Sequence, residues 1–222
     1  MNIDRILLVS RPVKRPYRAT KRAEAAAATR SAIRQAATEL FVERGYVATT
    51  MREVARRAEI GERTLYDAFP SKLVLFRHAL DVATVGDEEP VAVAERPEVQ
   101  AAMSESDPIA AVGMIVDYTA GLLERAGDLI MAGVDAASAD PDLKSGADAG
   151  AAATRAFWAA FVRSLVEHGS LRPDIDPDTA ADSLFALASP HLFRLLRRES
   201  GWPATKYRNW LANAVAAHLL TP

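Results

Sequence analysis

Apolar residues in the first third of the chain recur every three or four positions, which is the spacing of one face of an α-helix. Over residues 25–44 this stripe predicts a helix, and Gly45 follows it where a left-handed C-terminal cap is expected. Two shorter helices are predicted at 51–58 and 62–69. A fourth begins at Pro70-Ser71-Lys72, and its inner stripe is Leu73, Phe76 and Leu80.

The rest of the chain continues this helical periodicity. Prolines and acidic residues from Gly86 to Pro108 indicate a boundary between modules, with a short helix at 98–103 inside it. Longer helices follow, and Pro190 is expected to bend the one that contains it. Their predicted ranges are 109–124, 129–139 (ended by Asp140-Pro141), 149–168, 179–199 and 206–220. The sequence carries no strand pattern and no internal repeat, so the predicted fold class is all-α.

The two short helices at 51–58 and 62–69 are the most informative part of the pattern. Thr50 is a good N-cap for the first, and Glu53 is placed to complete a capping box with it. Apolar side chains can lock both helices against helix 25–44, namely Val54, Ala55, Ala58, Ile60, Leu65 and Phe69. This layout is typical of a helix-turn-helix unit, whose second helix enters the major groove of DNA. We therefore predict an N-terminal three-helix helix-turn-helix DNA-binding domain.

The outward side chains of this unit suit contacts with DNA. Arg63 can pair with guanine O6 and N7, Glu62 can accept from a cytosine amino group, and Thr64 can touch a thymine methyl group or a phosphate. The other candidates suit phosphates or the groove edge, where they set register without reading sequence. The predicted DNA-contacting residues are Thr50, Arg52, Glu62, Arg63, Thr64, Tyr66 and Lys72. The alternative is that Thr50 is only a cap and that Arg52 and Glu62 are only solvated.

The charge distribution favours the same end of the chain. Residues 1–80 hold 16 Lys and Arg against 8 Asp and Glu, whereas residues 81–222 hold 11 against 21. A basic first third joined to an acidic remainder predicts that only the first third meets a polyanion, although chance patterning of solvated faces is the alternative.

The first 24 residues are predicted to be a flexible basic arm, because Pro12 and Pro16 oppose a regular helix. Such an arm either adds backbone or minor-groove contacts through Arg18, Lys21 and Arg22, or takes no part in binding.

Several function classes find no support in the sequence. The chain has no Cys, which excludes disulfides, thiolate nucleophiles and Cys-ligated metals. Asp174, Asp176 and Asp178 alternate in a loop, but the Gly and the distant Glu of an EF-hand loop are missing, so a surface turn is the preferred interpretation. An enzyme with a helical domain remains an alternative, but no catalytic constellation, metal site or cofactor is predicted. No apolar run has the length of a membrane span, and the expected location is the cytoplasm.

Four sequence pieces recur together in one known family. They are Ala36-x-x-x-Leu40-Phe41, Gly45-Tyr46-x-x-Thr49-Thr50, Val54-Ala55-x-x-Ala58 and Thr64-Leu65-Tyr66-x-x-Phe69-Pro70-Ser71-Lys72. In this order and spacing, residues 29–76 resemble the tetracycline-repressor (TetR) family of bacterial regulators. Three positions depart from the family pattern: Glu59 stands where Gly is usual in the turn, Gly61 where Ser or Thr often caps, and Glu62 near a usual basic or small residue. These departures affect which operator is expected, not DNA binding itself.

The resemblance implies a ligand-responsive transcriptional regulator, with a repressor released from a palindromic operator by a small hydrophobic effector as the expected mode. It implies a DNA-binding domain at 25–72, a connecting helix at 73–85 and a ligand-binding and dimerisation domain at 86–222. It also implies a homodimer held by the last two long helices, for which two stripes are candidates: Leu184, Leu187, Ala188, His191 and Leu195, and Tyr207, Leu211, Ala214 and His218.

The resemblance further implies a mostly apolar pocket in the second domain. Its candidate lining residues are Met114, Tyr118, Leu122, Met131, Phe157, Phe161, Phe185 and Phe193, each of which is an ordinary core residue in the competing interpretation. Two functional alternatives remain open. One is an architectural DNA-binding protein without sequence preference, and the other is a regulator controlled by a protein partner.

Overall fold

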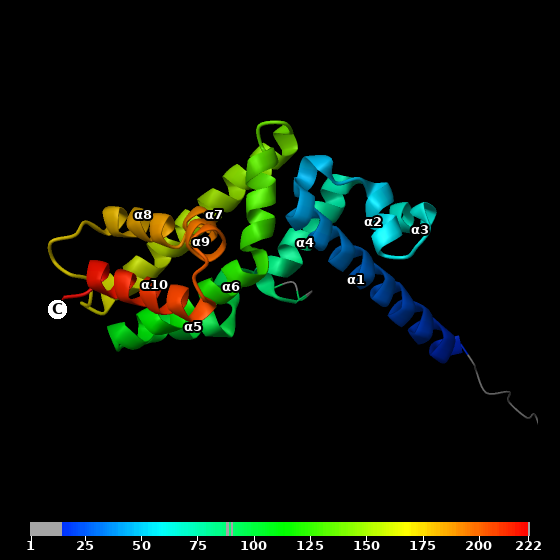
Figure 1. Ribbon diagram of the computed structural model, residues 1–222. Coiled ribbons are helices and arrows are strands. Elements are labelled where there is room, and N and C mark those ends of the chain that lie inside the picture. The colour runs from blue at the N-terminus through cyan, green and yellow to red at the C-terminus, as the bar shows by residue number, and fades with distance from the viewer. Residues whose placement is uncertain (1–14, 88, 90, 222) are drawn as a thin grey trace, which may run out of the picture.

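The computed structural model describes residues 15–87, 89 and 91–221, with side chains described from residue 20 onward. Within these residues the chain is built from helices, and its one extended pairing is an isolated bridge between Leu171 and Leu220. The all-α prediction is confirmed. Figure 1 shows a small N-terminal group of helices beside a larger C-terminal group, with helix α6 running between them.

Helix α1 spans Arg15–Ala48 and is much longer than predicted. The prediction of a flexible arm is wrong for residues 15–24, while residues 1–14 lie outside the described residues. Pro16 falls in the first turn, where its missing N–H has no intrahelical partner to lose, and an Ala-rich segment of high helix propensity follows. Near the other end, Gly45 takes φ 78° and ψ 166°, which kinks the helix before its last turn.

The next three helices match their predictions to within a residue or two. Helix α2 spans Met51–Arg57, α3 spans Glu62–Ala68 and α4 spans Lys72–Val85. The Ser71 hydroxyl caps α4 by accepting from the Val74 amide at 3.2 Å. On α4 the structure confirms Phe76 as buried, but Leu75 and Ala79 share its face, and the predicted Leu73 and Leu80 are only half-buried.

The hydrophobic core of the N-terminal helices does not close on itself. It joins α1, α2, α3 and α4, and it continues into Leu129 and Ala136 of α6 and Leu143 of the following helix. Phe76 is central, because its ring makes edge contacts with both Phe41 and Tyr46. A Cβ placed on Gly133 of α6 would lie 2.9 Å from the tip of the Phe76 ring, so only glycine allows this close approach.

Helix α6 spans Pro108–Ala136 as one continuous rod, where the sequence pattern predicts two helices. A second correction concerns Asp140-Pro141, which begins helix α7 (Pro141–Glu167) well before the predicted start at 149. The Asp140 carboxylate accepts from the Asp142 and Leu143 amides, and Pro141 occupies the first helical position, where proline is favoured. The same Asp-Pro signal starts α6. The short helix predicted at 98–103 is confirmed as α5 (Pro97–Ser104), which follows the 3₁₀ turn η1 (Val93–Glu95).

The helix predicted at 179–199 is divided at Pro190 rather than bent. Helix α8 spans Pro177–Leu187, α9 spans Pro190–Arg194, and a π-helical turn, η2 (Leu195–Glu199), continues α9. The Ser189 hydroxyl caps α9 by accepting from the Leu192 amide, so proline begins a new helix here. The last helix, α10, spans Ala204–Leu219.

Three arginines of α9 and η2 form ion pairs along α6. Arg194 reaches Asp135 at 2.8 Å, Arg198 reaches Asp128 at 2.8 Å, and Arg197 pairs with Glu124. Between these pairs, the Phe193 ring packs over Gly127, where an added Cβ would lie 2.9 Å from the ring. The C-terminal segment is therefore fixed in register along α6.

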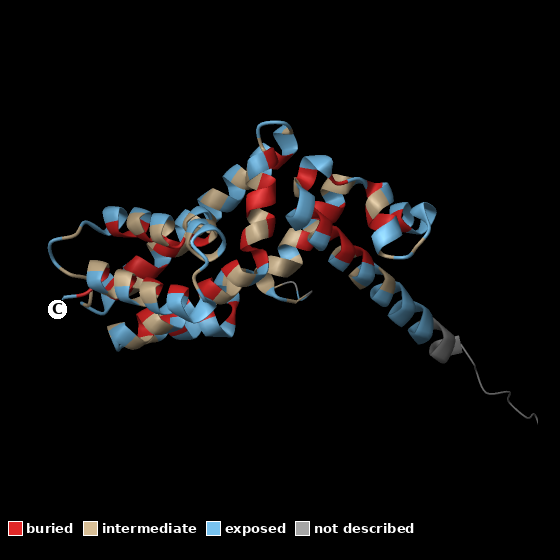
Figure 2. Ribbon diagram, viewed as in Figure 1, coloured by how far each residue is buried: buried red, intermediate tan, exposed pale blue. Residues whose placement is uncertain are grey.

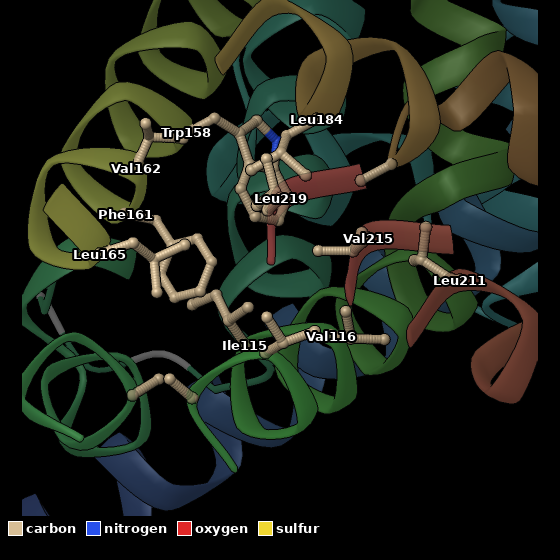
Figure 3. Packing of buried hydrophobic residues seen from close by; sticks show 14 of the residues in the cluster. Ile115, Val116, Trp158, Phe161, Val162, Leu165, Leu184, Leu211, Val215 and Leu219 are labelled. Atoms are coloured by element: carbon tan, nitrogen blue, oxygen red, sulfur yellow. The ribbon is translucent and has the colours of Figure 1, made fainter. Parts of the chain in front are cut away.

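The larger core gathers side chains from α5, α6, α7, α8, α9 and α10 (Figures 2 and 3). In Figure 3 the Phe161 ring of α7 lies toward Ile115 of α6, while Trp158 of α7 lies beside Leu184 of α8 and Leu219 of α10. The two stripes proposed for dimerisation contribute to the same core, with Leu184, Ala188, Tyr207 and Leu211 all buried within the single chain. Those four residues are therefore not available to a partner, and the stripe prediction is wrong for them.

The contact between Phe76 and Gly133 gives a stability prediction. Gly133→Ala forces the Phe76 ring out of its position, so we expect the free energy of unfolding to fall by about 1–3 kcal/mol. Gly146→Ala is the matched control, because Gly146 is an exposed residue of α7 with no heavy atom within 4 Å of the added Cβ. The Gly146→Ala control should raise the free energy of unfolding slightly, since alanine favours a helix more than glycine does. Thermal and urea unfolding measure both changes, and equal effects would contradict the role given to Gly133.

Candidate nucleic-acid interface and ligand cavity

The N-terminus of α2 carries the predicted capping box. The Thr50 hydroxyl accepts from the Glu53 amide at 3.2 Å, and the Glu53 carboxylate accepts from the Thr50 amide at 3.0 Å. Arg44 adds an ion pair to Glu53 at 2.6 Å. Hydrogen bonds from Thr50 hold the pKa of Glu53 below its ordinary value. Thr50 is thus engaged within its own helix while it remains exposed on the surface.

The turn between α2 and α3 has a strained residue where the family pattern has glycine. Glu59 takes φ 56°, a left-handed conformation that costs a residue with a Cβ about 1–2 kcal/mol. The Ile60 amide closes the turn by donating to the Ala55 carbonyl at 3.0 Å. The turn therefore closes with Glu59 in the left-handed conformation that glycine adopts more easily.

Helix α3 has one buried side and one free side. Leu65 and Phe69 are fully buried against α1 and α2, which fixes the helix. All the predicted reading residues on α3 lie on the exposed side, namely Glu62, Arg63, Thr64 and Tyr66. Glu62 lies 3.7 Å from Arg52 of α2, which is its ion-pair partner in the structure.

The C-terminus of α3 is held by a residue that sequence reasoning missed. Arg30 of α1 donates to the Ala68 carbonyl at 2.7 Å, and its guanidinium lies 4.3 Å from the centre of the Phe69 ring. A cation at this position satisfies a terminal carbonyl and also opposes the negative end of the helix dipole. The sequence gives no signal for this contact, because 38 positions separate the two residues.

Lys72 is placed differently from its prediction as a phosphate contact. Its ammonium group donates to the carbonyls of Tyr46, Val47 and Thr49 at 2.9, 3.4 and 3.0 Å, and it lies 4.3 Å from the centre of the Tyr46 ring. An ammonium group has three donors, so these bonds engage all of them. Burial lowers the pKa of Lys72 from its ordinary value. In the structure Lys72 ties the end of α1 to the start of α4, and a phosphate would have to displace one of these carbonyls.

The three candidate arm residues fall on the N-terminal part of α1. Lys21 and Arg22 are exposed on this helix, and the side chain of Arg18 lies outside the described residues. Figure 1 shows this part of α1 projecting away from the other helices. Any contact that these three residues make with DNA would therefore come from a helix rather than from an extended segment.

The predicted apolar pocket residues do not converge on one cavity. Phe161, Met131 and Phe193 are buried in the packed cores, and Met114 is exposed on α6. Phe185 is half-buried, with the Arg155 guanidinium 4.2 Å from its ring centre. Leu122 and Phe157 are half-buried residues packed against the same core. Tyr118 is the one candidate that lines the cavity described next.

This cavity has a volume of about 320 Å³ and lies where the end of α4 meets α6 and the start of α5. Its lining is polar rather than apolar, with five charged residues and Tyr118: Asp87, Arg96, Glu98, Asp117 and Arg125. Arg96 binds Asp87 through two hydrogen bonds of 2.6 and 2.9 Å, which lowers the pKa of the Asp87 carboxyl group. Burial raises the pKa of Tyr118. The expectation of a mostly apolar pocket is not met by this cavity.

Two further absences concern only the part of the chain that the structure describes. No group of His, Asp and Glu residues is arranged to hold a metal ion there, and no described helix is both long and apolar enough to span a membrane. In the loop of alternating aspartates, Asp174 pairs with Arg172 at 2.5 Å and Asp176 caps α8. These carboxylates therefore have structural partners.

Comparisons with known proteins agree with this architecture. Residues 33–79 match the family model described as "Bacterial regulatory proteins, tetR family". No curated protein sequence matches the chain. Among solved structures, a putative transcriptional regulator from Saccharomonospora viridis in complex with choline is 18% identical, with a TM-score of 0.68, covering 88% of this chain and 100% of that one.

Two other similar solved structures are a repressor and a protein bound to operator DNA. Native NalD, the secondary repressor of the MexAB-OprM multidrug efflux pump in Pseudomonas aeruginosa, is 20% identical with a TM-score of 0.64, covering 88% of this chain and 98% of that one. AibR in complex with isovaleryl coenzyme A and operator DNA is 17% identical with a TM-score of 0.63, covering 84% and 97%. At these identities the likeness is one of fold.

The contacts of Lys72 give a prediction that separates two roles. If Lys72 mainly holds α1 to α4, Lys72→Met should lower the free energy of unfolding by about 1–3 kcal/mol, since buried carbonyls lose a charged donor. Lys144→Met is the control, because Lys144 makes only an exposed ion pair with Asp148 within α7. Denaturant unfolding measures the difference. A stable Lys72→Met protein that binds every DNA sequence less well would instead identify Lys72 as a phosphate ligand.

The contact of Arg30 gives a local prediction. Arg30→Met removes the donor to the Ala68 carbonyl, so we expect amide hydrogens of α3 to exchange about three- to tenfold faster, consistent with the loss of one solvent-exposed hydrogen bond. Arg22→Met, on the exposed N-terminal part of α1, is the matched control. Hydrogen exchange read by mass spectrometry resolves the peptide that contains α3. Unchanged exchange in α3 would show that Leu65 and Phe69 alone hold this helix.

Proposed function

We propose that this chain, which belongs to the TetR family of bacterial regulatory proteins, is a homodimeric DNA-binding regulator of transcription that a small molecule releases from its operator. The observation that carries the proposal is the two-sided character of α3. Its apolar side is fixed by Leu65 and Phe69, while Arg63, Thr64 and Tyr66 are free to meet base edges and phosphates.

The charge of the chain supports binding to a polyanion at this end. The N-terminal 80 residues carry a net charge of +8, from 16 basic and 8 acidic residues, and the remainder carries −10, from 11 and 21. Exposed Lys21 and Arg22 on α1 extend the basic surface beyond the helix-turn-helix unit. Such a distribution attracts the phosphate backbone to the N-terminal helices and keeps it away from the rest of the chain.

The descriptions of similar structures support the two kinds of partner in the proposal. One similar protein was solved with operator DNA and isovaleryl coenzyme A, another with choline, and a third is described as a repressor. By analogy we propose an operator and a small-molecule effector for this chain. A dimer with two-fold symmetry would place its two copies of α3 about 34–36 Å apart, one turn of DNA, and would therefore need a palindromic operator.

The mechanism that we propose is linkage between effector and operator. Helix α4 packs on α6 through the core that contains Phe76, so a displacement of α6 moves the helix-turn-helix unit with α4. An effector that binds better to the displaced form weakens operator binding, and the operator must weaken effector binding by the same factor. In a repressor, this release permits transcription.

The test is selection of bound genomic DNA fragments by the purified full-length protein, followed by affinity measurements on the selected site. We expect a palindromic site. Arg63→Ala should lose discrimination at one base position in each half-site, at a cost of about 1–3 kcal/mol. In vitro transcription from the selected site then distinguishes repression from activation.

The control for Arg63→Ala is Arg163→Ala, an exposed arginine of α7 on the acidic part of the chain, which should leave binding unchanged. Two outcomes would overturn the proposal. Affinity that falls steeply with salt but does not depend on sequence would identify an architectural DNA-binding protein. Specific binding that is unaffected by Arg63→Ala would show that α3 is not the reading helix.

A further inference from the structure

The cavity at the end of α4 has an unusual balance of charge. Asp87 is neutralised by Arg96, and Asp117 lies 3.5 Å from Arg208 of α10. Among the charged lining residues, Arg125 and Glu98 have no ion-pair partner in the described part of the chain. The cavity therefore presents one cation and one anion that take part in no ion pair within the described residues.

Arg125 is held in an open position. Its guanidinium lies beside two glycines, since a Cβ on Gly86 would be 3.3 Å from its Nε and a Cβ on Gly121 would be 3.4 Å from its Nη1. Its own hydrogen bonds are long, because Nε and Nη2 donate to the carbonyls of Ala83 and Thr84 at 3.4 Å each. These carbonyls belong to the last turn of α4. Arg125 thus has both access to a ligand and a weak hold on the end of α4.

The other polar groups of the cavity also favour a polar ligand. The Tyr118 hydroxyl is buried without a hydrogen-bond partner among the described residues, and so is Nε of Arg96, a residue that is only 8% exposed. Arg125 and Glu98 act on the Tyr118 hydroxyl in opposite directions, the first lowering and the second raising its pKa, after the larger effects of burial and of Arg96. All these groups therefore lie within electrostatic reach of one another.

We propose that this cavity binds a small zwitterion, whose carboxylate or phosphate group meets Arg125 and whose ammonium group meets Glu98. A ligand with only a negative charge would face Glu98, and one with only a positive charge would face Arg125. The volume of about 320 Å³ is at the lower end of the range for ligand pockets and accommodates a molecule of amino-acid size. This inference rests on the proposed function, because it gives the chemical class of the effector.

The site also gives a route from ligand to DNA. A carboxylate makes shorter and stronger bonds to a guanidinium than the two 3.4 Å contacts with the carbonyls of α4. A bound zwitterion therefore withdraws Arg125 from the last turn of α4, which loses a cation opposite its dipole. Helix α4 begins at Lys72, next to α3, so loosening its far end changes how the helix-turn-helix unit is held.

Titration calorimetry on the full-length protein tests the ligand class. The probes are free amino acids, each compared with the carboxylic acid that lacks its amino group and the amine that lacks its carboxyl group; alanine, for example, is compared with propionate and ethylamine. We expect at least one amino acid to bind about tenfold more tightly than either of its fragments, because it forms one further ion pair. If no amino acid exceeds its fragments, the inference is overturned.

Two variants assign the charges and one serves as control. Arg125→Gln should abolish the advantage of the amino acid over the amine, and Glu98→Gln should abolish its advantage over the acid. Arg163→Gln changes an exposed residue of α7 and should leave both advantages of the amino acid unchanged. Thermal unfolding verifies that all three proteins fold. Retention of both advantages in Arg125→Gln and Glu98→Gln would overturn the assignment of the site.

Operator binding distinguishes this inference from the proposed function. If the protein binds a specific operator but no zwitterion binds at the cavity, the effector class is wrong and the regulator remains. If specific DNA binding fails as well, the proposed function fails. A zwitterion that binds through Arg125 should also weaken the operator complex in wild type, and should leave it unchanged in Arg125→Gln.

Discussion

The packing of α1 and α4 on α6 is the constraint on which the other features of the molecule depend. The N-terminal helices do not enclose a core of their own, because Leu129 and Ala136 of α6 complete it. Helices α4 and α6 approach each other closely where the Phe76 ring packs on Gly133. The same ring contacts Phe41 and Tyr46, which links this packing to α1. The surface proposed to contact DNA is therefore held by the larger group of helices, and the proposed effect of a ligand on DNA binding has a physical path through this contact.

Charged side chains that bind backbone carbonyls determine where the short helices lie. Arg30 holds the end of α3, Lys72 joins the end of α1 to the start of α4, and Arg125 reaches the last turn of α4. The C-terminus of each helix has carbonyls without an intrahelical partner, and a long cationic side chain from another helix can satisfy them. Three basic residues in this protein thus act within the fold, although a basic residue near a helix-turn-helix unit is readily interpreted as a DNA ligand.

The sequence predicted the helix-turn-helix unit well because its signals are local. The capping box at Thr50 and Glu53, the buried Leu65 and Phe69, and the turn at Glu59 depend on neighbours within a few positions. The junctions at Asp140-Pro141 and Ser189-Pro190 were misjudged, because proline that follows a capping residue starts a helix as readily as it ends one. The start of α1 was misjudged because Pro16 lies in the first turn, where proline is tolerated.

The cavity could not be predicted, because its charged residues come from the segment after α4, from the start of α5 and the residue before it, and from α6, and no periodicity links them. The apolar pocket failed for a related reason, since a stripe such as Phe157 and Phe161 has the same spacing whether it lines a cavity or fills a core.

The ion pairs of Arg194, Arg197 and Arg198 with α6 have a consequence for movement within the molecule. The three ion pairs are spread along α6 from Glu124 to Asp135, and the Phe193 ring packs over Gly127 between Glu124 and Asp128. A shift along α6 would move the Phe193 ring from Gly127 to a position that carries a side chain. The segment α9–η2 and α6 therefore keep one alignment. Arg125, in the same part of α6, holds the last turn of α4 only through two long hydrogen bonds, so the contact between α6 and the end of α4 is the one that can loosen.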